Sequence, residues 1–394
     1  MHPVAALAAV VLLTLVRGGA PTLTAISAAE LRQHLMDASP GTTILVAPGT
    51  YGGVYAVGVR GDADGPVVVR PANPGDPPIL AEGMQISEAA HLVLEGLVIA
   101  GAAGNGLNID DGGTPESPSH HVTLRGLVVR DCGGRGNHDG IKLSGVDDFR
   151  LEGCTVERWG RGGSAVDMVG CHRGTIERCV FRDQESDPAA SGVQAKGGSA
   201  DIVVRRCRFE HAGQRAVNIG GSTGHAFFRP TLSEAALAAA GQRPSIAEVR
   251  DMLVEECTFI GSAAPIAFVG ADGAVVRRNT IFRPSAWVLR ILQESRGPAF
   301  VPCRNGAFVG NIVVYRIGAI RSPVNIGPDT AAETFRFADN HWFAEDDPPR
   351  SRPVLPVPEV DGQAGADPGF VDAAAGDLRL RDDSPARGRG VPPQ

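Results

Sequence analysis

The sequence predicts an all-β protein whose chain coils into a right-handed parallel β-helix. Three observations predict this fold class. Short segments with the pattern of a β-strand recur along the middle of the chain, and a second kind of strand segment recurs between them. The chain is also rich in glycine, with 51 among 394 residues, which favours many short strands joined by turns.

The first repeated segment is five residues long, and its five regular copies start at intervals of 34, 25, 27 and 24 residues. Its second and fourth residues are apolar, so period-two alternation places them inside and places the third and fifth residues outside. The five regular and three less regular copies are GLNID (106–110), GIKLS (140–144), AVDMV (165–169), GVQAK (192–196), AVNIG (216–220), PIAFV (265–269), VLRIL (288–292) and PVNIG (323–327).

The second repeated segment adds another strand column to each coil. Its copies are LRGLVV (124–129), LEGCTV (151–156), IERCVF (176–181), VRRCRF (204–209), VEECTF (254–259), VRRNTI (276–281) and FVGNIV (308–313). Two columns per coil at these periods indicate a parallel β-helix, whereas a propeller would need periods near ~40. Four cysteines share one inward position of this column, and we expect a ladder of reduced thiols, with disulfides or zinc as alternatives.

The N-terminal region predicts two elements. Residues 4–16 form an apolar run shorter than the roughly 20 residues that span a bilayer. We therefore predict a signal peptide over residues 1–25 and export to the periplasm or the medium. A buried N-terminal strand or short helix is the alternative. Residues 27–36 predict a helix that caps the solenoid, with Ser27 as N-cap and Glu30 completing a capping box.

The remaining chain divides into a solenoid and a tail. The solenoid is expected over residues 26–345. It is interrupted by an insert at residues 222–250, where the spacing of the first repeat widens to 49 residues. The insert contains a predicted helix at residues 231–240 and is expected to overhang the outer strand face. Residues 346–394 are rich in Pro, Asp and Gly and are predicted to pack on the solenoid or cap it.

Charge excludes one class of partner. The net charge of −7 and the lack of a basic block argue against nucleic-acid binding, because no cluster of cations is present to replace the counterions of phosphates. Sugars, metals and proteins remain open as ligands. No segment after the N-terminal run is apolar enough for a membrane span, and we expect a monomer.

Stacking the first repeat predicts a polar outer wall. Its third position contributes Asn108, Lys142, Asp167, Gln194, Asn218, Ala267, Arg290 and Asn325, and its fifth position contributes Asp110, Ser144, Val169, Lys196 and Gly220. Asn105, Asp139 and Arg215 lie just before these strands. The first position is Gly or Ala in the regular copies, which we expect to leave room for a ligand beside the wall.

This inventory suits β-elimination on a uronate polymer. The reaction needs a cation to neutralise the sugar carboxylate, a base for the neighbouring C–H and an acid for the leaving oxygen. The residues predicted to be catalytic are Lys196 as base, Arg215 or Lys142 as the neutralising cation, and Asp167. Those predicted to contact substrate are Asn108, Asp110, His138, Asp139, Gln194, Asn218, Phe228 and Arg229.

Other functions fit the same residues. Lys142 and Asp167 could simply form an ion pair on a solvated wall. The carboxylates could serve a glycoside hydrolase, proton abstraction could serve an epimerase, and the wall could bind carbohydrate without turnover. His120 and His121 are adjacent in a predicted strand, so we expect their side chains to diverge and not to share a metal. No motif in the sequence names a metal.

Parts of the sequence resemble a known superfamily. AAELRQHLMDASPGTTILVAPGTY, GPVVVRPANPGDPPIL and LVLEGLVIAG resemble the opening of pectin-lyase-like β-helix proteins, and polysaccharide lyase family 6 has the most similar N-terminal pattern. Residues 105–230 resemble a bacterial group of right-handed β-helix proteins. The resemblance to family 6 implies a lysine base, a nearby arginine and a calcium ion held by acidic residues. Lys196 in GVQAKGGS matches the lysine, whereas Ala189–Ser191 stand where acidic residues are expected.

Overall fold

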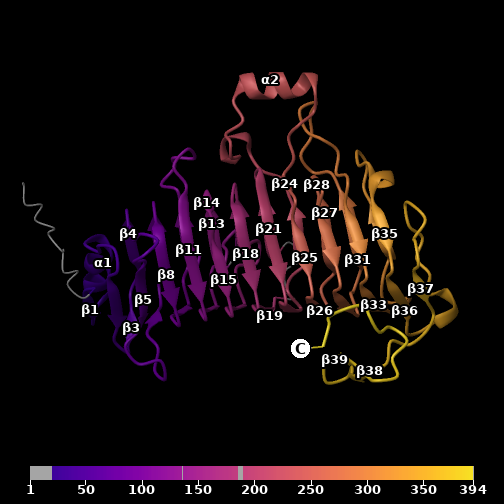
Figure 1. Cartoon of the computed structure of the whole chain (residues 1–394), viewed down its shortest axis with the longest axis horizontal. Helices are drawn as coiled ribbons and strands as arrows, with labels where there is room; N and C mark the ends of the chain where they lie inside the picture. The colour runs from indigo at the N-terminus through magenta and orange to yellow at the C-terminus, as the bar shows by residue number, and fades with distance from the viewer. Residues whose placement is uncertain (1–19, 135, 185–189, 394) are drawn as a thin grey trace, which may run out of the picture.

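The computed structural model describes residues 20–134, 136–184 and 190–393. They form a right-handed parallel β-helix whose coils stack along one long axis (Figure 1). The prediction of the fold class is confirmed. The predicted signal peptide falls mostly on residues 1–19, which lie outside the described residues.

Three parallel sheets run along the solenoid. Sheet A contains β1 (Thr22–Ala25), β2 (Thr43–Val46), β5 (Val67–Pro71), β8 (Ala90–Glu95), β11 (Ser119–Arg125), β14 (Val146–Asp147), β15 (Arg150–Glu152), β18 (His172–Glu177), β21 (Ser199–Arg205), β24 (Val249–Arg250), β25 (Leu253–Glu255), β28 (Ala271–Asp272), β29 (Val275–Arg277), β32 (Ala307–Val309) and β35 (Arg336–Ala338). Sheet B contains β3 (Thr50–Tyr51), β6 (Ile79–Leu80), β9 (Val98–Ala100), β12 (Val128–Arg130), β16 (Thr155–Glu157), β19 (Val180–Arg182), β22 (Arg208–Glu210), β26 (Thr258–Ile260), β30 (Thr280–Phe282), β33 (Ile312–Tyr315), β36 (His341–Ala344) and β37 (Gln363–Ala364). Sheet C contains β4 (Val54–Val57), β7 (Met84–Ser87), β10 (Leu107–Asp110), β13 (Ile141–Ser144), β17 (Ser164–Val169), β20 (Ser191–Lys196), β23 (Arg215–Gly220), β27 (Ala264–Val269), β31 (Trp287–Leu292) and β34 (Ser322–Ile326).

The expectation of two strand columns per coil is wrong, because the second predicted column consists of two strands joined by a corner. Gly126, with φ 59°, separates β11 from β12, and Gly153 (φ 63°) and Arg178 (φ 53°) hold the same place in the next coils. A single residue in the left-handed region turns the backbone, and the pattern of apolar residues in the sequence continues on both sides of this corner. Each coil therefore crosses sheets A, B and C.

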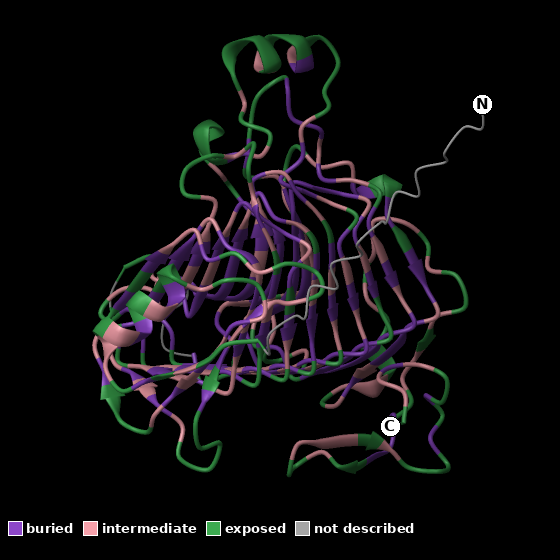
Figure 2. Cartoon of the chain, turned by 60° about the vertical axis from the view of Figure 1, so that its left-hand side comes forward, coloured by how far each residue is buried: buried purple, intermediate pink, exposed green. Residues whose placement is uncertain are grey.

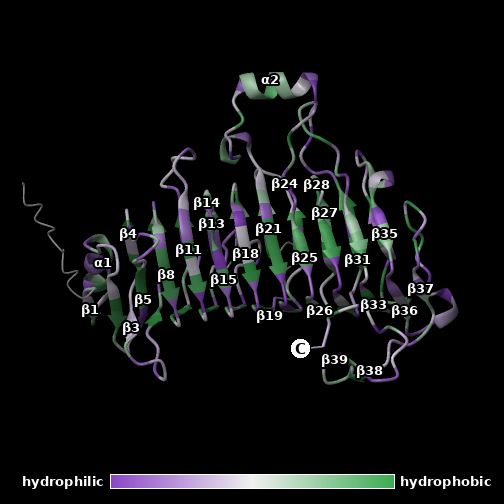
Figure 3. Ribbon diagram, viewed as in Figure 1, coloured by the Kyte–Doolittle hydropathy of each residue, from purple (hydrophilic) through white to green (hydrophobic). Residues whose placement is uncertain are grey.

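The core is a set of ladders inside the coils. Strand residues are mostly buried on their inner face, and the strand bodies carry most of the hydrophobic residues while the turns are largely hydrophilic (Figures 2 and 3). Phe181, Phe209 and Phe259 stack in successive coils with ring centroids 4.9 and 4.7 Å apart. Every coil buries apolar surface in this way, and this burial stabilises the fold by about 25 cal/mol for each Å² removed from water.

The predicted ladder of reduced thiols is present, and it continues as an asparagine ladder. All seven cysteines are free and buried. The ladder runs through Cys154, Cys179, Cys207, Cys257, Asn279, Asn311 and Asn340. Each asparagine accepts from the backbone N–H of the preceding rung, and Asn279 and Asn311 also donate to a carbonyl oxygen of the preceding coil. These buried amides are therefore satisfied coil by coil.

The N-terminal end of the solenoid is covered by a helix, and the C-terminal tail packs on sheet B. At the N-terminal end, helix α1 (Ala28–Met36) buries Leu31 and Leu35, and the Ser27 hydroxyl accepts from Glu30 N at 3.1 Å, as predicted. At the other end, η2 (Ala332–Thr334) and η3 (Pro348–Arg350) lead into the tail. The tail hairpin β38 (Phe370–Asp372) and β39 (Asp377–Leu380) folds back beneath sheet B, where Phe370 packs on Phe282 (Figure 1).

The insert projects from the solenoid after β23. It contains η1 (His225–Phe227) and α2 (Glu234–Gln242), whose N-cap Ser233 accepts from Ala236 N. Helix α2 stands well away from the coils and is largely exposed (Figures 1 and 2). Among the described helices, none is long and apolar enough to pass through a bilayer.

Candidate functional site

The outer wall of sheet C follows the predicted register. Asn108, Lys142, Asp167, Gln194 and Asn218 are consecutive partners in parallel pairing. Adjacent strands lie about 4.8 Å apart, so these five residues form a strip about 19 Å long. The column continues through Ala267, Arg290 and Asn325. Residues far apart in the chain thus share one face.

At the centre of this wall, two lysines meet one buried carboxylate. Asp167 is 1% exposed, its Oδ2 lies 2.7 Å from Lys142 Nζ, and its Oδ1 lies 3.3 Å from Lys196 Nζ. These are the two lysines of the chain, whose other cationic side chains are arginines and histidines. The lysine count is a signal in the sequence that points to this site. We refer to Asp139, Lys142, Asp167 and Lys196 as the lysine–aspartate cluster.

Asp139 anchors the cluster from the loop before β13. Its Oδ2 lies 3.3 Å from Lys142 Nζ, and its Oδ1 accepts from Ser164 N at 2.7 Å. Burial, followed by the charge of Asp167, raises the pKa of Asp139. Burial opposes the charged form of Lys142, but the charges of Asp167 and Asp139 outweigh it and raise the pKa of that lysine. Lys142 is therefore a fixed cation at neutral pH.

One oxygen of the cluster is not hydrogen-bonded. Asp167 Oδ1 is buried, and its 3.3 Å approach to Lys196 Nζ is an ion pair without hydrogen-bond geometry among the described residues. A buried acceptor without a hydrogen bond costs free energy. The charge of this oxygen is therefore available to Lys196, the cation beside it.

The Lys196 stem is packed by the base of the insert. A Cβ on Gly221 would lie 2.6 Å from Gln194 Nε2 and 3.3 Å from Lys196 Cδ, so glycine leaves space for both side chains. Gly197 N, directly after the lysine, donates to Glu248 Oε2 at 2.9 Å. The insert therefore supports one end of the lysine–aspartate cluster.

Arg215 is on the same wall but does not join the cluster. Its guanidinium donates to Asn218 Oδ1 at 3.1 Å and pairs with Glu294 Oε1 at 2.7 Å. Arg215 faces Ser191 in the register, five residues before Lys196, which places the two backbones about 16 Å apart along the strands. The structure favours Lys142 over Arg215 as the cation beside Lys196.

The wall residues on the N-terminal side form a second polar group. Asp110 Oδ2 accepts from Asn108 Nδ2 at 2.7 Å and from Gln85 Nε2 at 3.1 Å. An open groove of about 500 Å³ adjoins them, and it is lined by residues that include Tyr55, Gln85 and Asn108. Tyr55 is 49% exposed and offers a ring on which a sugar can stack. Sequence reasoning missed Tyr55, which precedes the regular repeats.

The small first residues of the repeat have a packing role. A Cβ on Gly192 would lie 2.3 Å from the carbonyl oxygen of Ala216, and one on Gly140 would lie 2.5 Å from Val156 Cγ1. Both positions are buried against neighbouring coils. The expectation that they leave room for a ligand is therefore wrong.

His138 lies in the tight turn before β13. A Cβ on Gly160 would come within 2.3 Å of its carbonyl oxygen, and one on Gly133 within 2.4 Å of its Cβ. Its side chain is partly exposed beside the buried Asp139. The structure thus places His138 directly before Asp139 of the lysine–aspartate cluster, and its contact with substrate stays a prediction.

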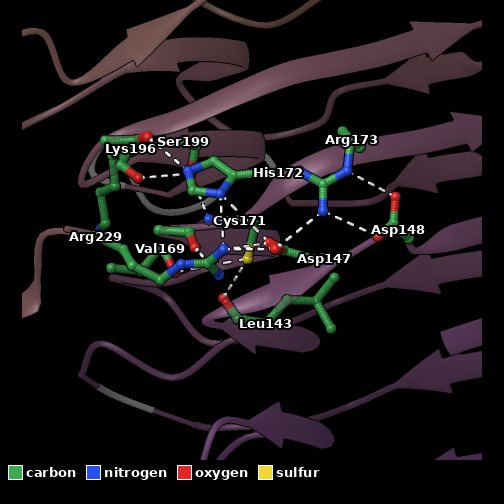
Figure 4. A network of polar contacts seen from close by, with 12 residues as sticks. Leu143, Asp147, Asp148, Val169, Cys171, His172, Arg173, Lys196, Ser199 and Arg229 are labelled. Carbon is green, nitrogen blue, oxygen red and sulfur yellow. Dashed lines mark hydrogen bonds and ion pairs between the residues drawn. The ribbon is translucent and has the colours of Figure 1, made fainter. Parts of the chain in front are cut away.

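Phe228 and Arg229 anchor the insert and do not reach the wall. Phe228 is 2% exposed, and Arg229 Nη2 lies 2.6 Å from both carboxylate oxygens of Asp147 and 2.8 Å from His172 Nδ1 (Figure 4). Burial alone would raise the pKa of Asp147, but hydrogen bonds from His172 and Arg229 lower it. The prediction that Phe228 and Arg229 contact substrate is corrected, because Phe228 is buried and the Arg229 guanidinium binds the buried carboxylate of Asp147 instead.

The cluster does not fit the calcium ion that the family resemblance implies. Calcium takes six to eight oxygen ligands. Asp139 and Asp167 already face lysine ammonium groups, and neither belongs to a close group of three acidic or histidine ligands within the described ranges. We therefore derive no chemical step through calcium.

Comparisons with known proteins agree with this architecture. The family model described as "Right handed beta helix region" matches residues 79–232 and 116–281. A search of curated proteins finds no significant match. Among solved structures, pectate lyase Pel9A is similar with a TM-score of 0.61 and 10% identity, covering 93% of this chain and 90% of that one. The family 6 polysaccharide lyase Pedsa3628 from Pseudopedobacter saltans has a TM-score of 0.50 and 12% identity, covering 94% and 99%.

Proposed function

The chain belongs to the right-handed β-helix family, and on this premise we propose that it is a polysaccharide lyase that cleaves an acidic, uronate-containing polymer along sheet C. One observation carries the proposal: both lysines of the chain converge on Asp167 in the middle of an outward polar wall. Similar structures include lyases that act on polysaccharides, which supports a carbohydrate substrate.

Lys142 would neutralise the sugar carboxylate. Its charge is secured by the raised pKa that Asp167 and Asp139 produce. A fixed cation next to the carboxylate stabilises the negative charge that develops when the neighbouring carbon loses its proton. Arginine would supply the charge with a larger, planar head, whereas the lysine ammonium is compact enough to fit between two carboxylates.

Lys196 would transfer the proton. After its ammonium group has given up a proton to solvent, its amine takes the proton from the carbon next to the carboxylate, and the C–H electron pair forms a double bond as the glycosidic C–O bond breaks. The leaving oxygen then takes a proton from Lys196, which returns the amine to its starting form. Asp167 Oδ1, which lacks a hydrogen bond, would hold the lysine in position by its charge.

Neighbouring wall residues would bind the polymer on both sides of the cleaved bond. Asn108 and Asp110 lie on one side with the groove at Tyr55. Gln194 and Asn218 lie on the other side, where Arg215 supplies a further cation for an acidic sugar. We also propose that the protein is exported. Strand β1 begins at Thr22, so a cleavage that keeps this strand intact falls before it.

Incubation with a panel of uronate polymers tests this proposal. A lyase gives an unsaturated product that absorbs ultraviolet light. The Lys196→Ala and Lys142→Ala variants should form this product at least 100-fold more slowly, which is the rate effect typical of a positioned acid–base group. The matched control is Arg70→Ala, an exposed cation of sheet A. New reducing ends without ultraviolet absorbance would identify a hydrolase. Inversion of a sugar carbon without cleavage of the polymer would identify an epimerase.

Binding without turnover is a second candidate function. It is favoured by the ion pairs themselves, because Lys142 and Lys196 both have carboxylate partners in the folded chain. Affinity electrophoresis in gels that contain the same polymers distinguishes it. Retardation without any product, weakened in the Asn108→Ala and Tyr55→Ala variants, would establish a carbohydrate-binding wall.

A further inference from the structure

Three histidines gather on sheet A, away from the lysine–aspartate cluster. His91 belongs to β8, and His120 and His121 belong to β11. One ligand nitrogen from each lies within 4.8 Å of the others. The rings of His91 and His121 stack at 4.4 Å, and His120 meets both edge-on at 5.3 and 5.1 Å.

The gathering overturns the expectation that adjacent histidines diverge. His91 and His121 have φ values of 49° and 54°, so neither follows extended strand geometry. Their neighbours stay in register, since Ala90 pairs with His120 and Leu92 with Val122. The two left-handed residues therefore occupy equivalent corners in successive coils, and side-chain alternation does not hold across them.

The donor set suits a transition metal. Neutral imidazole is the commonest protein ligand for such ions, and three histidines with an open position form a familiar zinc donor set. In a tetrahedral zinc site the ligand nitrogens lie about 3.3 Å apart. His120 Nδ1 and His121 Nδ1 are 3.0 Å apart, so small ring rotations would bring all three nitrogens to an ion.

The surroundings leave space for the remaining ligands. His91 and His121 line an open depression of about 380 Å³, together with Asp62 and Asp148. Asp148 is held by the Arg173 guanidinium, whose Nε lies 2.8 Å away. Arg150 and Arg173 also line the depression and balance its two carboxylates, so the histidine nitrogens are the ligands, and water can complete the coordination of an ion.

We propose that His91, His120 and His121 form a binding site for one divalent transition-metal ion, such as Zn²⁺, on the outer surface of sheet A. The ion bridges β8 and β11 and so ties two successive coils together. It is independent of the lysine–aspartate cluster, because its ligands lie on a different sheet. In the metal-free chain, ring stacking and a hydrogen bond between His120 and His121 hold the same side chains.

Calorimetric titration of the untagged, metal-free full chain with zinc chloride tests the proposal. We expect saturable binding of one ion per chain and at least tenfold weaker binding in His91→Asn, His120→Ala and His121→Asn. Asparagine is chosen at the two corners because it tolerates the left-handed conformation. His225→Ala, at an exposed histidine of the insert, is the matched control and should bind as the wild type does.

A second measurement separates a metal site from a purely structural cluster. Cobalt(II) substitution should give visible absorption from nitrogen coordination, and zinc should raise the thermal unfolding temperature of the wild type but not of the triple variant. Unchanged zinc affinity in a folded triple variant would overturn the proposal, as would the lack of saturable binding in the wild type. Circular dichroism checks that each variant is folded.

Discussion

Lys196 Nζ lies 3.3 Å from Asp167 Oδ1, a buried oxygen that accepts no hydrogen bond from any described residue. The same carboxylate forms a shorter contact of 2.7 Å with Lys142 through its other oxygen. The two lysines therefore differ, because Lys142 donates a hydrogen bond to Asp167 and Lys196 forms only an ion pair with it. This asymmetry underlies the separate roles proposed for them.

Removing the central charge should destabilise the solenoid. Asp167→Asn leaves Lys142 and Lys196 facing a neutral amide in a partly buried site, and we expect a loss of about 1–3 kcal/mol in the free energy of unfolding. Urea unfolding measures it. The matched control is the exposed Asp201→Asn, which should change stability little. Equal stability of both variants would contradict a stabilising cluster.

The raised pKa of Lys142 should appear in the dependence of stability on pH. A lysine whose folded pKa is raised contributes stability that is complete below its unfolded value of about 10.4 and is lost as pH rises through the folded value. The difference in urea midpoint between the wild type and Lys142→Met should therefore be constant near neutrality and shrink in strongly alkaline solution. Lys142→Arg stays charged at these pH values and serves as the control. A difference that grows with pH would show the opposite linkage.

The cysteine ladder should be unreactive in the folded protein. All seven thiols are buried, and burial raises the pKa of Cys132 and Cys303 to about 11. A thiol-reactive dye should label no cysteine in the native state and seven after denaturation without reductant. Ser222→Cys, at an exposed position of the insert, should add one rapidly labelled thiol. Fewer than seven reactive thiols after denaturation would indicate disulfides.

The asparagine ladder should be sensitive to truncation. Asn311 donates to Val276 O at 3.2 Å and accepts from Asn279, so Asn311→Ala leaves buried polar groups without partners. We expect a loss of about 1–3 kcal/mol for each group left unsatisfied, measured by urea unfolding. The exposed Asn137→Ala serves as the control, and a loss no larger than in that control would contradict the ladder's role.

The insert should loosen when its anchor is changed. Arg229 reaches both oxygens of Asp147 and the carbonyl of Gly170, which a lysine cannot match with a single ammonium group. Limited proteolysis of Arg229→Lys should cut near α2 several-fold faster than in the wild type, while the solenoid stays intact. Arg243→Lys, an exposed arginine of the insert, should be cut at the wild-type rate.

The sequence predicted the solenoid and the wall because both depend on a repeated pattern of apolar letters. It failed at the corners, where one left-handed residue turns the chain. His121 and Gly126 show this failure, since each follows the strand pattern in the sequence but not in the backbone. Long polar side chains were also hard to place from the sequence. Arg229 binds Asp147, which lies 82 residues away in the chain, and no local sequence pattern predicts such a contact.

The pairing of both lysines at one carboxylate has a practical consequence. Amine-directed reagents that couple proteins to resins, dyes or cross-linkers can attach to this chain only at its terminus and at this one patch. Immobilisation through either lysine would therefore cover the lysine–aspartate cluster. A dye placed there would, in turn, report directly on whatever occupies it.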